Sequence, residues 1–175
     1  TQKNADKIAA LVSVLTPSPG TSLVYCATRK SVEEVTVLLR SNGVPAAMYH
    51  GGLSTEDRVS VQEGFMAGHY PVVVATNAFG MGVDKDDVRC IVHWEFPGTV
   101  EAYYQEIGRA GRDGKDSRVV LLYRDVDRKT QEFFINSSYP SKEAVELVWE
   151  NLNSRLMSSY STDQQARKAL SQNAS

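Results

Sequence analysis

The stretch VVVATNAFGMGVDKDDVRCIVHWEFP, residues 72–97, decides the fold. It opens with four apolar residues in a row, which is typical of a short strand buried on both faces, as in the centre of a parallel sheet. A loop containing Gly80 and Gly82 follows, and the chain then enters a second apolar run at 88–96. This stretch therefore predicts two buried strands joined by a glycine-containing loop.

On both sides of this stretch the chain alternates between strand-like and helix-like segments. Short apolar runs alternate with segments whose apolar residues recur every three or four positions, and Gly or Pro marks several of the breaks. This order, with short connections, predicts an α/β fold with an open, mostly parallel sheet and helices on both faces, in which ligands bind at the carboxyl ends of the strands. The expected strands are 22–26, 44–50, 70–76, 88–96 and 117–123, and the expected helices are 2–15, 31–41, one that Ser54 opens, and 99–112.

After Tyr123 the pattern changes to helices alone. Residues 124–138 look helical, and a further amphipathic helix from Ser141 carries Val145, Val148, Trp149 and Leu152 on one side. We expect one domain over residues 1–136, and a helical extension or the start of an accessory domain, partly disordered, over 137–175. The aromatic residues Trp94, Trp149, Phe133 and Phe134 are expected to belong to the core.

Composition excludes several classes of protein. The chain has 175 residues, of which 42% are hydrophobic, so it holds one domain of ordinary size and no more. Its net charge of −2 gives no overall basic field for nucleic acid. Cys26 and Cys90 lie in apolar runs and are interpreted as reduced core thiols, and three isolated histidines without a Cys-x-x-Cys pair predict no metal site. No signal peptide or membrane-spanning run is present, so we expect a cytoplasmic chain without a membrane partner.

The stretch YYQEIGRAGRDG, residues 103–114, contains the strongest candidate site residues. Arg109 and Arg112 are three positions apart, so on a helix they project from the same side. A guanidinium in a water-poor cleft binds a γ-phosphate and stabilises the charge that develops as it departs. The alternative is a solvated helix end whose arginines favour the helix dipole. The full string with Gln105 makes that alternative the weaker one.

The parts that would cradle a triphosphate are absent from this sequence. No GxxxxGK[ST] loop occurs, because Asp116 follows Gly114-Lys115 where a hydroxyl is needed. No Asp-Glu pair ends an apolar strand to hold magnesium either. Arginines suited to phosphate without a cradle predict a site that another domain completes.

Further candidates stand where strands are expected to end. The Thr76 hydroxyl and the loop amides after it suit a nucleic-acid phosphate, and the Asp84 carboxylate suits a ribose hydroxyl; a plain glycine-rich turn is an equally good interpretation. Thr28 and Arg29 form a small hydroxyl and basic cluster, for which a helix N-cap is an equal alternative. His50 receives no acid/base role.

Several of these strings together resemble the second RecA-like lobe of superfamily 2 helicases, and within it the RecQ family of DNA helicases. LVYCATRKSVEEV resembles motif IV, and YHGGLSTEDRVSVQEGF resembles the segment after it. The stretch 72–97 resembles motif V, and 103–114 resembles motif VI. The resemblance covers roughly residues 20–135, and GMGVDK and YYQE favour RecQ over the DEAD-box RNA helicases.

The resemblance implies that ATP and Mg²⁺ are held mainly by a preceding RecA-like lobe, and that single-stranded DNA or a duplex junction runs across both lobes with 3′-to-5′ polarity. It implies an arginine finger at Arg112 with Arg109 as its partner and Gln105 as a helper, and nucleotide contacts from Asp84 and Gly82. The implied DNA contacts are Thr28, Arg29, His50, Thr76 and Asn77. We expect this chain alone to be monomeric and inactive as an ATPase, with roles in DNA repair and recombination, associated with the nucleoid if the source is bacterial.

One departure from the RecQ pattern concerns zinc. RecQ enzymes commonly continue into a four-cysteine zinc module, whereas no cysteine follows Cys90. We expect a branch without zinc, in which residues 141–175 begin a different accessory domain; the alternative is that the chain ends before that module. Two other functions stay open: the lobe of a superfamily 2 RNA helicase, and a non-catalytic lobe that only binds nucleic acid or protein.

Overall fold

The computed structural model describes residues 2–16, 18, 20–80, 83–138 and 141–154. By the density of contacts along the chain, it divides into two units, Thr1–Glu132 and Phe133–Ser175.

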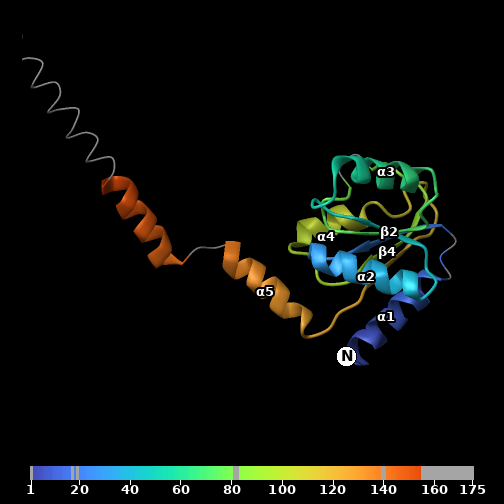
Figure 1. Ribbon diagram of the computed structural model, residues 1–175, viewed down its shortest axis with the longest axis horizontal. Coiled ribbons are helices and arrows are strands. Elements are labelled where there is room, and N and C mark those ends of the chain that lie inside the picture. The colour runs from blue at the N-terminus through green and yellow to red at the C-terminus, as the bar shows by residue number, and fades with distance from the viewer. Residues whose placement is uncertain (1, 17, 19, 81–82, 139–140, 155–175) are drawn as a thin grey trace, which may run out of the picture. The chain divides into compact units, whose positions relative to one another are not determined.

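The first unit is built on one five-stranded sheet in the order β2-β3-β1-β4-β5 (Figure 1). Every pair of neighbouring strands is parallel, and in the centre Leu23 lies between Val73 and Ile91. The predicted open parallel sheet is therefore confirmed. The strands are β1 (Thr21–Tyr25), β2 (Ala46–Tyr49), β3 (Val72–Ala75), β4 (Val88–His93) and β5 (Arg118–Leu121).

Helices cover both faces of the sheet, as predicted. On one face α1 (Gln2–Leu15) and α2 (Arg29–Ser41) bury Leu11 and Leu39 against strand residues such as Val24. On the other face α3 (Thr55–Met66) buries Phe65, and Figure 1 shows α3 across the sheet from α2. Alternation of side chains along each strand divides the core into these two layers.

The helix before the arginines is shorter than predicted. It was expected over 99–112, but α4 runs only from Val100 to Ile107, with Thr99 as its N-cap and Gly108 as its C-cap. Gly111 has a φ of +60°, and a Cβ there would lie 2.6 Å from the carbonyl oxygen of Lys115. The backbone at Gly111 therefore favours glycine, and the arginines lie on turns after the helix.

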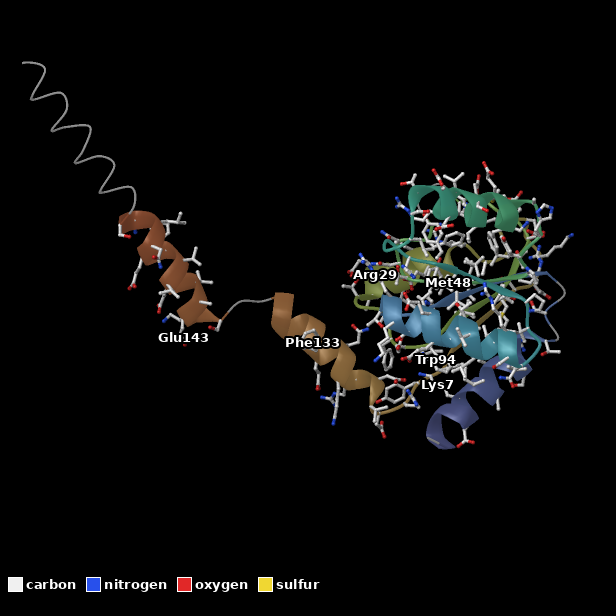
Figure 2. The ribbon with its side chains drawn as sticks, in the orientation of Figure 1. Lys7, Arg29, Met48, Trp94, Phe133 and Glu143 are labelled. Carbon is white, nitrogen blue, oxygen red and sulfur yellow. The ribbon has the colours of Figure 1, made fainter. Side chains whose placement is uncertain are left out.

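A buried ion pair ties α1 to the start of α5 (Asp127–Ser138). The Lys7 ammonium lies 2.6 Å from the Asp127 carboxylate and 4.3 Å from the centre of the Trp94 ring (Figure 2). The same carboxylate accepts a hydrogen bond from the backbone N–H of Arg124 at 3.0 Å. Burial lowers the pKa of Lys7, although Asp127 opposes that shift.

The second unit exposes the side chains that were expected in a core. Within it, helix 142–154 carries an apolar side whose Trp149 is 64% exposed, and Phe133 is 66% exposed. The core prediction is therefore wrong for these two exposed residues, and it is right for Trp94, which is 6% exposed. The side chain of Phe134 lies outside the described residues. Among the helices that are described, none is long and apolar enough to cross a membrane.

Candidate nucleotide and nucleic-acid site

Predicted site residues gather at the carboxyl edge of the sheet, because parallel strands all end there. Thr28 follows β1, His50 follows β2 and Thr76 follows β3. The loop after β3 is held by hydrogen bonds: the Thr76 amide donates to the Tyr49 carbonyl at 3.2 Å, and the Thr76 hydroxyl accepts from the Ala78 amide at 3.4 Å. This part of the edge is thus fixed before any ligand arrives.

Arg109 contacts the backbone of this loop. Its Nη1 donates to the Gly80 carbonyl at 2.7 Å. Gly80 has a φ of +142°, and a Cβ on it would lie 2.4 Å from the Arg109 Cζ, so the guanidinium packs directly on the glycine. The nearby Tyr25 hydroxyl donates to the Phe79 carbonyl at 3.4 Å, and burial raises the pKa of Tyr25 against the opposing charge of Arg109. Arg109 therefore joins the turn after α4 to the loop after β3.

Arg112 is bound much less tightly. Its guanidinium forms an ion pair with Asp84, in which the two side chains are 36% and 81% exposed, and its Nε donates to the Gly108 carbonyl at 3.4 Å. Exposed ion pairs of this kind contribute at most about 1 kcal/mol to the stability of the folded protein. The structure thus brings together the two residues predicted for phosphate and for ribose, and both remain accessible.

The residues predicted to contact DNA differ in their solvent exposure and in their hydrogen bonds to the protein. Asn77 and Arg29 are exposed, and Arg29 lies against the turn at 51–52, where a Cβ on Gly52 would be 3.2 Å from its Nη1. His50 is 4% exposed; its Nδ1 accepts from the Gly52 amide at 3.2 Å and its Nε2 lies 3.3 Å from the Glu33 carboxylate. His50 therefore holds the turn on which Arg29 rests.

Sequence reasoning missed Glu95, which organises the loop after β1. One oxygen of its carboxylate accepts from the Ala27 amide at 2.8 Å, and the other accepts from the Ser31 hydroxyl at 2.8 Å. The Thr28 hydroxyl in turn accepts from the Ser31 amide at 3.0 Å, which makes Thr28 the N-cap of α2. An acidic residue near the carboxyl end of a buried apolar run was the available signal.

The two remaining predicted residues are Gln105 and Gly82. Gln105 is exposed on α4. Gly82 lies outside the described residues. Among those that are described, no group of three or more His, Cys, Asp or Glu side chains is placed to hold a metal ion.

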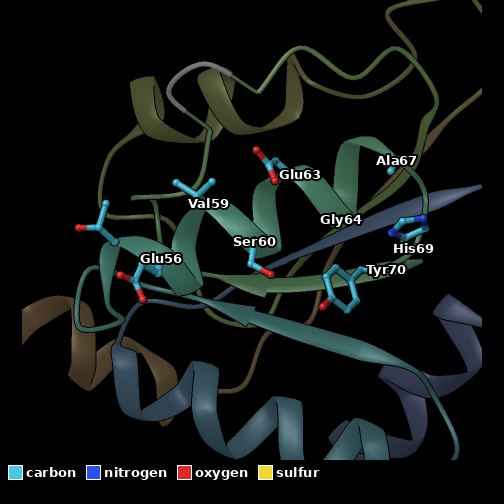
Figure 3. A pocket seen from close by; sticks show the side chains of 9 residues that line it. Glu56, Val59, Ser60, Glu63, Gly64, Ala67, His69 and Tyr70 are labelled. Carbon is cyan, nitrogen blue, oxygen red and sulfur yellow. The ribbon is translucent and has the colours of Figure 1, made fainter.

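A groove of about 630 Å³ lies apart from these residues, along the outer side of α3 (Figure 3). Glu56, Val59 and Glu63 line it from the helix, and Tyr70 closes its other side. None of the predicted site residues that the structure describes borders it. The candidate site is therefore the carboxyl edge of the sheet together with the arginine turn, the segment after α4 that carries Arg109 and Arg112.

Comparison with protein families decides what this arrangement belongs to. The model of the helicase conserved C-terminal domain matches residues 6–114, which include the whole candidate site. The chain belongs to the helicase conserved C-terminal domain family. The matched residues include strands β1 to β4, the loop after β3 and both arginines.

Among its relatives, this helicase C-terminal domain is similar to RecQ-type proteins. It is 42% identical over 142 residues to the probable ATP-dependent DNA helicase RecS of Bacillus subtilis, with 81% of this chain and 29% of the relative covered. It is 48% identical over 118 residues to the ATP-dependent DNA helicase Q5 of Mus musculus, with 67% of this chain and 12% of the relative covered. The predicted RecQ resemblance is confirmed, and the chain spans less than a third of the length of these relatives.

Solved structures confirm the fold. The C-terminal domain of the DEAD-box protein Dbp5 is 26% identical with a TM-score of 0.61, over 77% of this chain and 78% of that one. The Escherichia coli DEAD-box protein SrmB, solved with regulator of ribonuclease activity A, is 27% identical with a TM-score of 0.64, over 70% and 73%. The helicase C-terminal domain thus shares its RecA-like architecture with both.

Proposed function

We propose that this domain is the second motor lobe of an ATP-dependent DNA helicase and works with a first lobe that supplies the phosphate cradle. Curated relatives that are 42–50% identical are named ATP-dependent helicases or DNA helicases. The DEAD-box structures, two of them with RNA and ADP BeF3 bound, are 26–27% identical. This difference favours DNA over RNA as the substrate.

The observation that carries the proposal is the contrast between the two arginines. Arg109 is fixed to the Gly80 carbonyl, whereas Arg112 is joined to the exposed Asp84 and to a carbonyl on its own turn. An exposed pair costs little to separate, so Arg112 is free to turn to a γ-phosphate in the cleft between the lobes. We assign the role of arginine finger to Arg112, and Arg109 supports it by fixing the loop.

Separation of that pair releases a second group. Asp84 then accepts a hydrogen bond from the ribose, while the guanidinium of Arg112 faces the charge that grows on the departing phosphate. Gln105, exposed on α4, lies two residues before that helix ends and helps at the interface between the lobes. Mg²⁺ is assigned to the first lobe, because no described carboxylate cluster in this chain suits it.

DNA contacts are assigned to the carboxyl edge. Arg29 and Asn77 are exposed there and suit backbone phosphates, which are bound without reading the sequence. Thr28, His50 and Thr76 already hold their own turns, so we assign them contacts through the loops that they fix. Closing and reopening of the two lobes around ATP would step the enzyme in the 3′-to-5′ direction.

The test is Arg112→Ala in a polypeptide that carries both lobes. We expect kcat for ATP hydrolysis to fall by about 10³- to 10⁵-fold, with the KM for ATP nearly unchanged, because a finger acts on the transition state. Arg128→Ala is the matched control, since Arg128 is an exposed arginine paired with Glu132 and borders no part of the site. Retained turnover in Arg112→Ala would remove the finger assignment, and turnover by this 175-residue chain alone would remove the two-lobe model.

A further inference from the structure

A buried pair lies beneath the arginine turn and has no part in the proposed chemistry. His93 is the last residue of β4 and is 1% exposed, and Glu106 lies in the last turn of α4 and is 8% exposed. The His93 Nε2 is 2.8 Å from a carboxylate oxygen of Glu106. Burial of a carboxylate costs free energy unless the group is hydrogen-bonded, and His93 supplies such a bond to Glu106.

The surroundings of His93 make Glu106 its principal polar contact. The imidazole lies 5.8 Å from the Tyr25 ring and 5.3 Å from the Tyr103 ring, measured between ring centres. Its Nδ1 is buried without a hydrogen-bond partner among the described residues. The bond at Nε2 therefore orients the ring, and the two aromatic neighbours restrict its tilt.

The segment with the arginines is attached to both ends of β4, and at the amino end the Arg89 side chain also forms an ion pair with Asp113. The Glu106 side chain is bonded to His93 at the carboxyl end of β4, and the Gly111 amide donates to the Val88 carbonyl at its amino end, at 3.0 Å. Arg109 leaves the segment between these two anchors, and Arg112 follows directly after the second. Without the first anchor, the segment would lose its fixed distance from the carboxyl edge, and the bond from the Gly111 amide to the Val88 carbonyl would open more often.

We propose that the buried His93–Glu106 pair positions the turn that carries Arg109 and Arg112. Neither residue touches substrate in this proposal; both are positioning residues, and the inference rests on the proposed arginine function. The pair fixes the end of α4 on β4, so that Arg109 meets the Gly80 carbonyl and Arg112 stands beside Asp84. Displacement of a catalytic group by about 1 Å lowers rates by up to roughly 100-fold, which is the effect that such an anchor prevents.

The activity test uses two changes in the polypeptide with both lobes. Glu106→Gln keeps a side chain that hydrogen-bonds to either ring tautomer. The double change His93→Phe with Glu106→Met replaces the pair by apolar groups of similar size, which commonly preserves stability. We expect the double variant to stay folded yet to lose about 10- to 100-fold in kcat with little change in the KM for ATP, and Glu106→Gln to retain most of the activity. Glu101→Gln, an exposed change on the first turn of α4, is the control.

A second measurement on the chain itself separates this inference from the proposed function. Hydrogen exchange by NMR should show faster exchange of the Gly111 amide in the double variant, with amides of β1 and β3 unchanged. Full kcat in the double variant, or a loss in Glu106→Gln as large as in the double variant, would overturn the positioning role. A two-lobe protein without any ATPase activity would instead remove the proposed function, while an unchanged Gly111 exchange rate would still remove the anchor.

Discussion

At the scale of single residues, Gly80 and Arg109 depend on each other. The guanidinium occupies the space that a Cβ on residue 80 would fill, and the backbone there has a φ of +142°. A side chain at this position therefore meets both conformational strain and a direct clash. The guanidinium of Arg109 thus helps to join the turn after α4 to the loop after β3.

Gly80→Ala should lower the free energy of unfolding by about 1–3 kcal/mol, from backbone strain alone, and the clash with Arg109 adds to that. Gly68→Ala is the control, because Gly68 has a φ of +78° with no atom within 4 Å of the added Cβ. Urea denaturation of Gly80→Ala, Arg109→Ala and the double variant measures the coupling. If the loss of unfolding free energy in the double variant equals the sum of the losses in the two single variants, the guanidinium does not restrict residue 80.

At the scale of elements, the buried Lys7–Asp127 pair connects the first helix to the last helix of the lobe. Both side chains are about 5% exposed, so a charge left there without its partner would be poorly solvated. The pair has a natural comparison in Arg128–Glu132, one turn along α5, whose side chains are 74% and 50% exposed.

Asp127→Ala should cost about 3–5 kcal/mol of unfolding free energy, because Lys7 is left buried without its partner. Glu132→Ala should cost less than about 1 kcal/mol, since exposed pairs contribute little. Chemical denaturation of the two variants beside the wild type measures the difference. Equal losses would mean that Lys7 escapes to solvent when its partner is removed.

The elements also show how far the sequence could lead. Strand and helix order followed from apolar periodicity, since the runs at 22–26 and 70–76 are too short and too apolar for anything but buried strands. The end of α4 was missed because the prediction carried the helix through Gly108 and Gly111, although a glycine commonly ends a helix. Glu95, Glu106 and His93 were missed because their roles arise from contacts between segments 13 to 68 positions apart, which periodicity does not reveal. The exposure of Trp149 was not predicted, because an apolar side of a helix indicates burial but does not show which surface it packs against.

At the scale of the whole molecule, the choice between DNA and RNA is the open property. The contacts assigned at the carboxyl edge are to phosphates, which both polymers carry, so the fold by itself does not discriminate. We expect the protein with both lobes to unwind a DNA duplex and to leave the matched RNA duplex intact, in line with its higher identity to the DNA helicases. Strand separation followed by fluorescence on duplexes of equal length and overhang measures this, and a preference for RNA would contradict the RecQ-type assignment of function.

The central place of β1 has a consequence for synthesis on the ribosome. Ser22 pairs with Val72 on one side and with Cys90 on the other, so the strand made first must wait for partners made 50 and 68 residues later. Until β4 has left the exit tunnel, β1 has an open edge of backbone groups that invites association with other nascent chains. A helicase C-terminal domain of this topology therefore completes its sheet only after β4 and β5 have been made, and β1 keeps an open edge until β4 pairs with it.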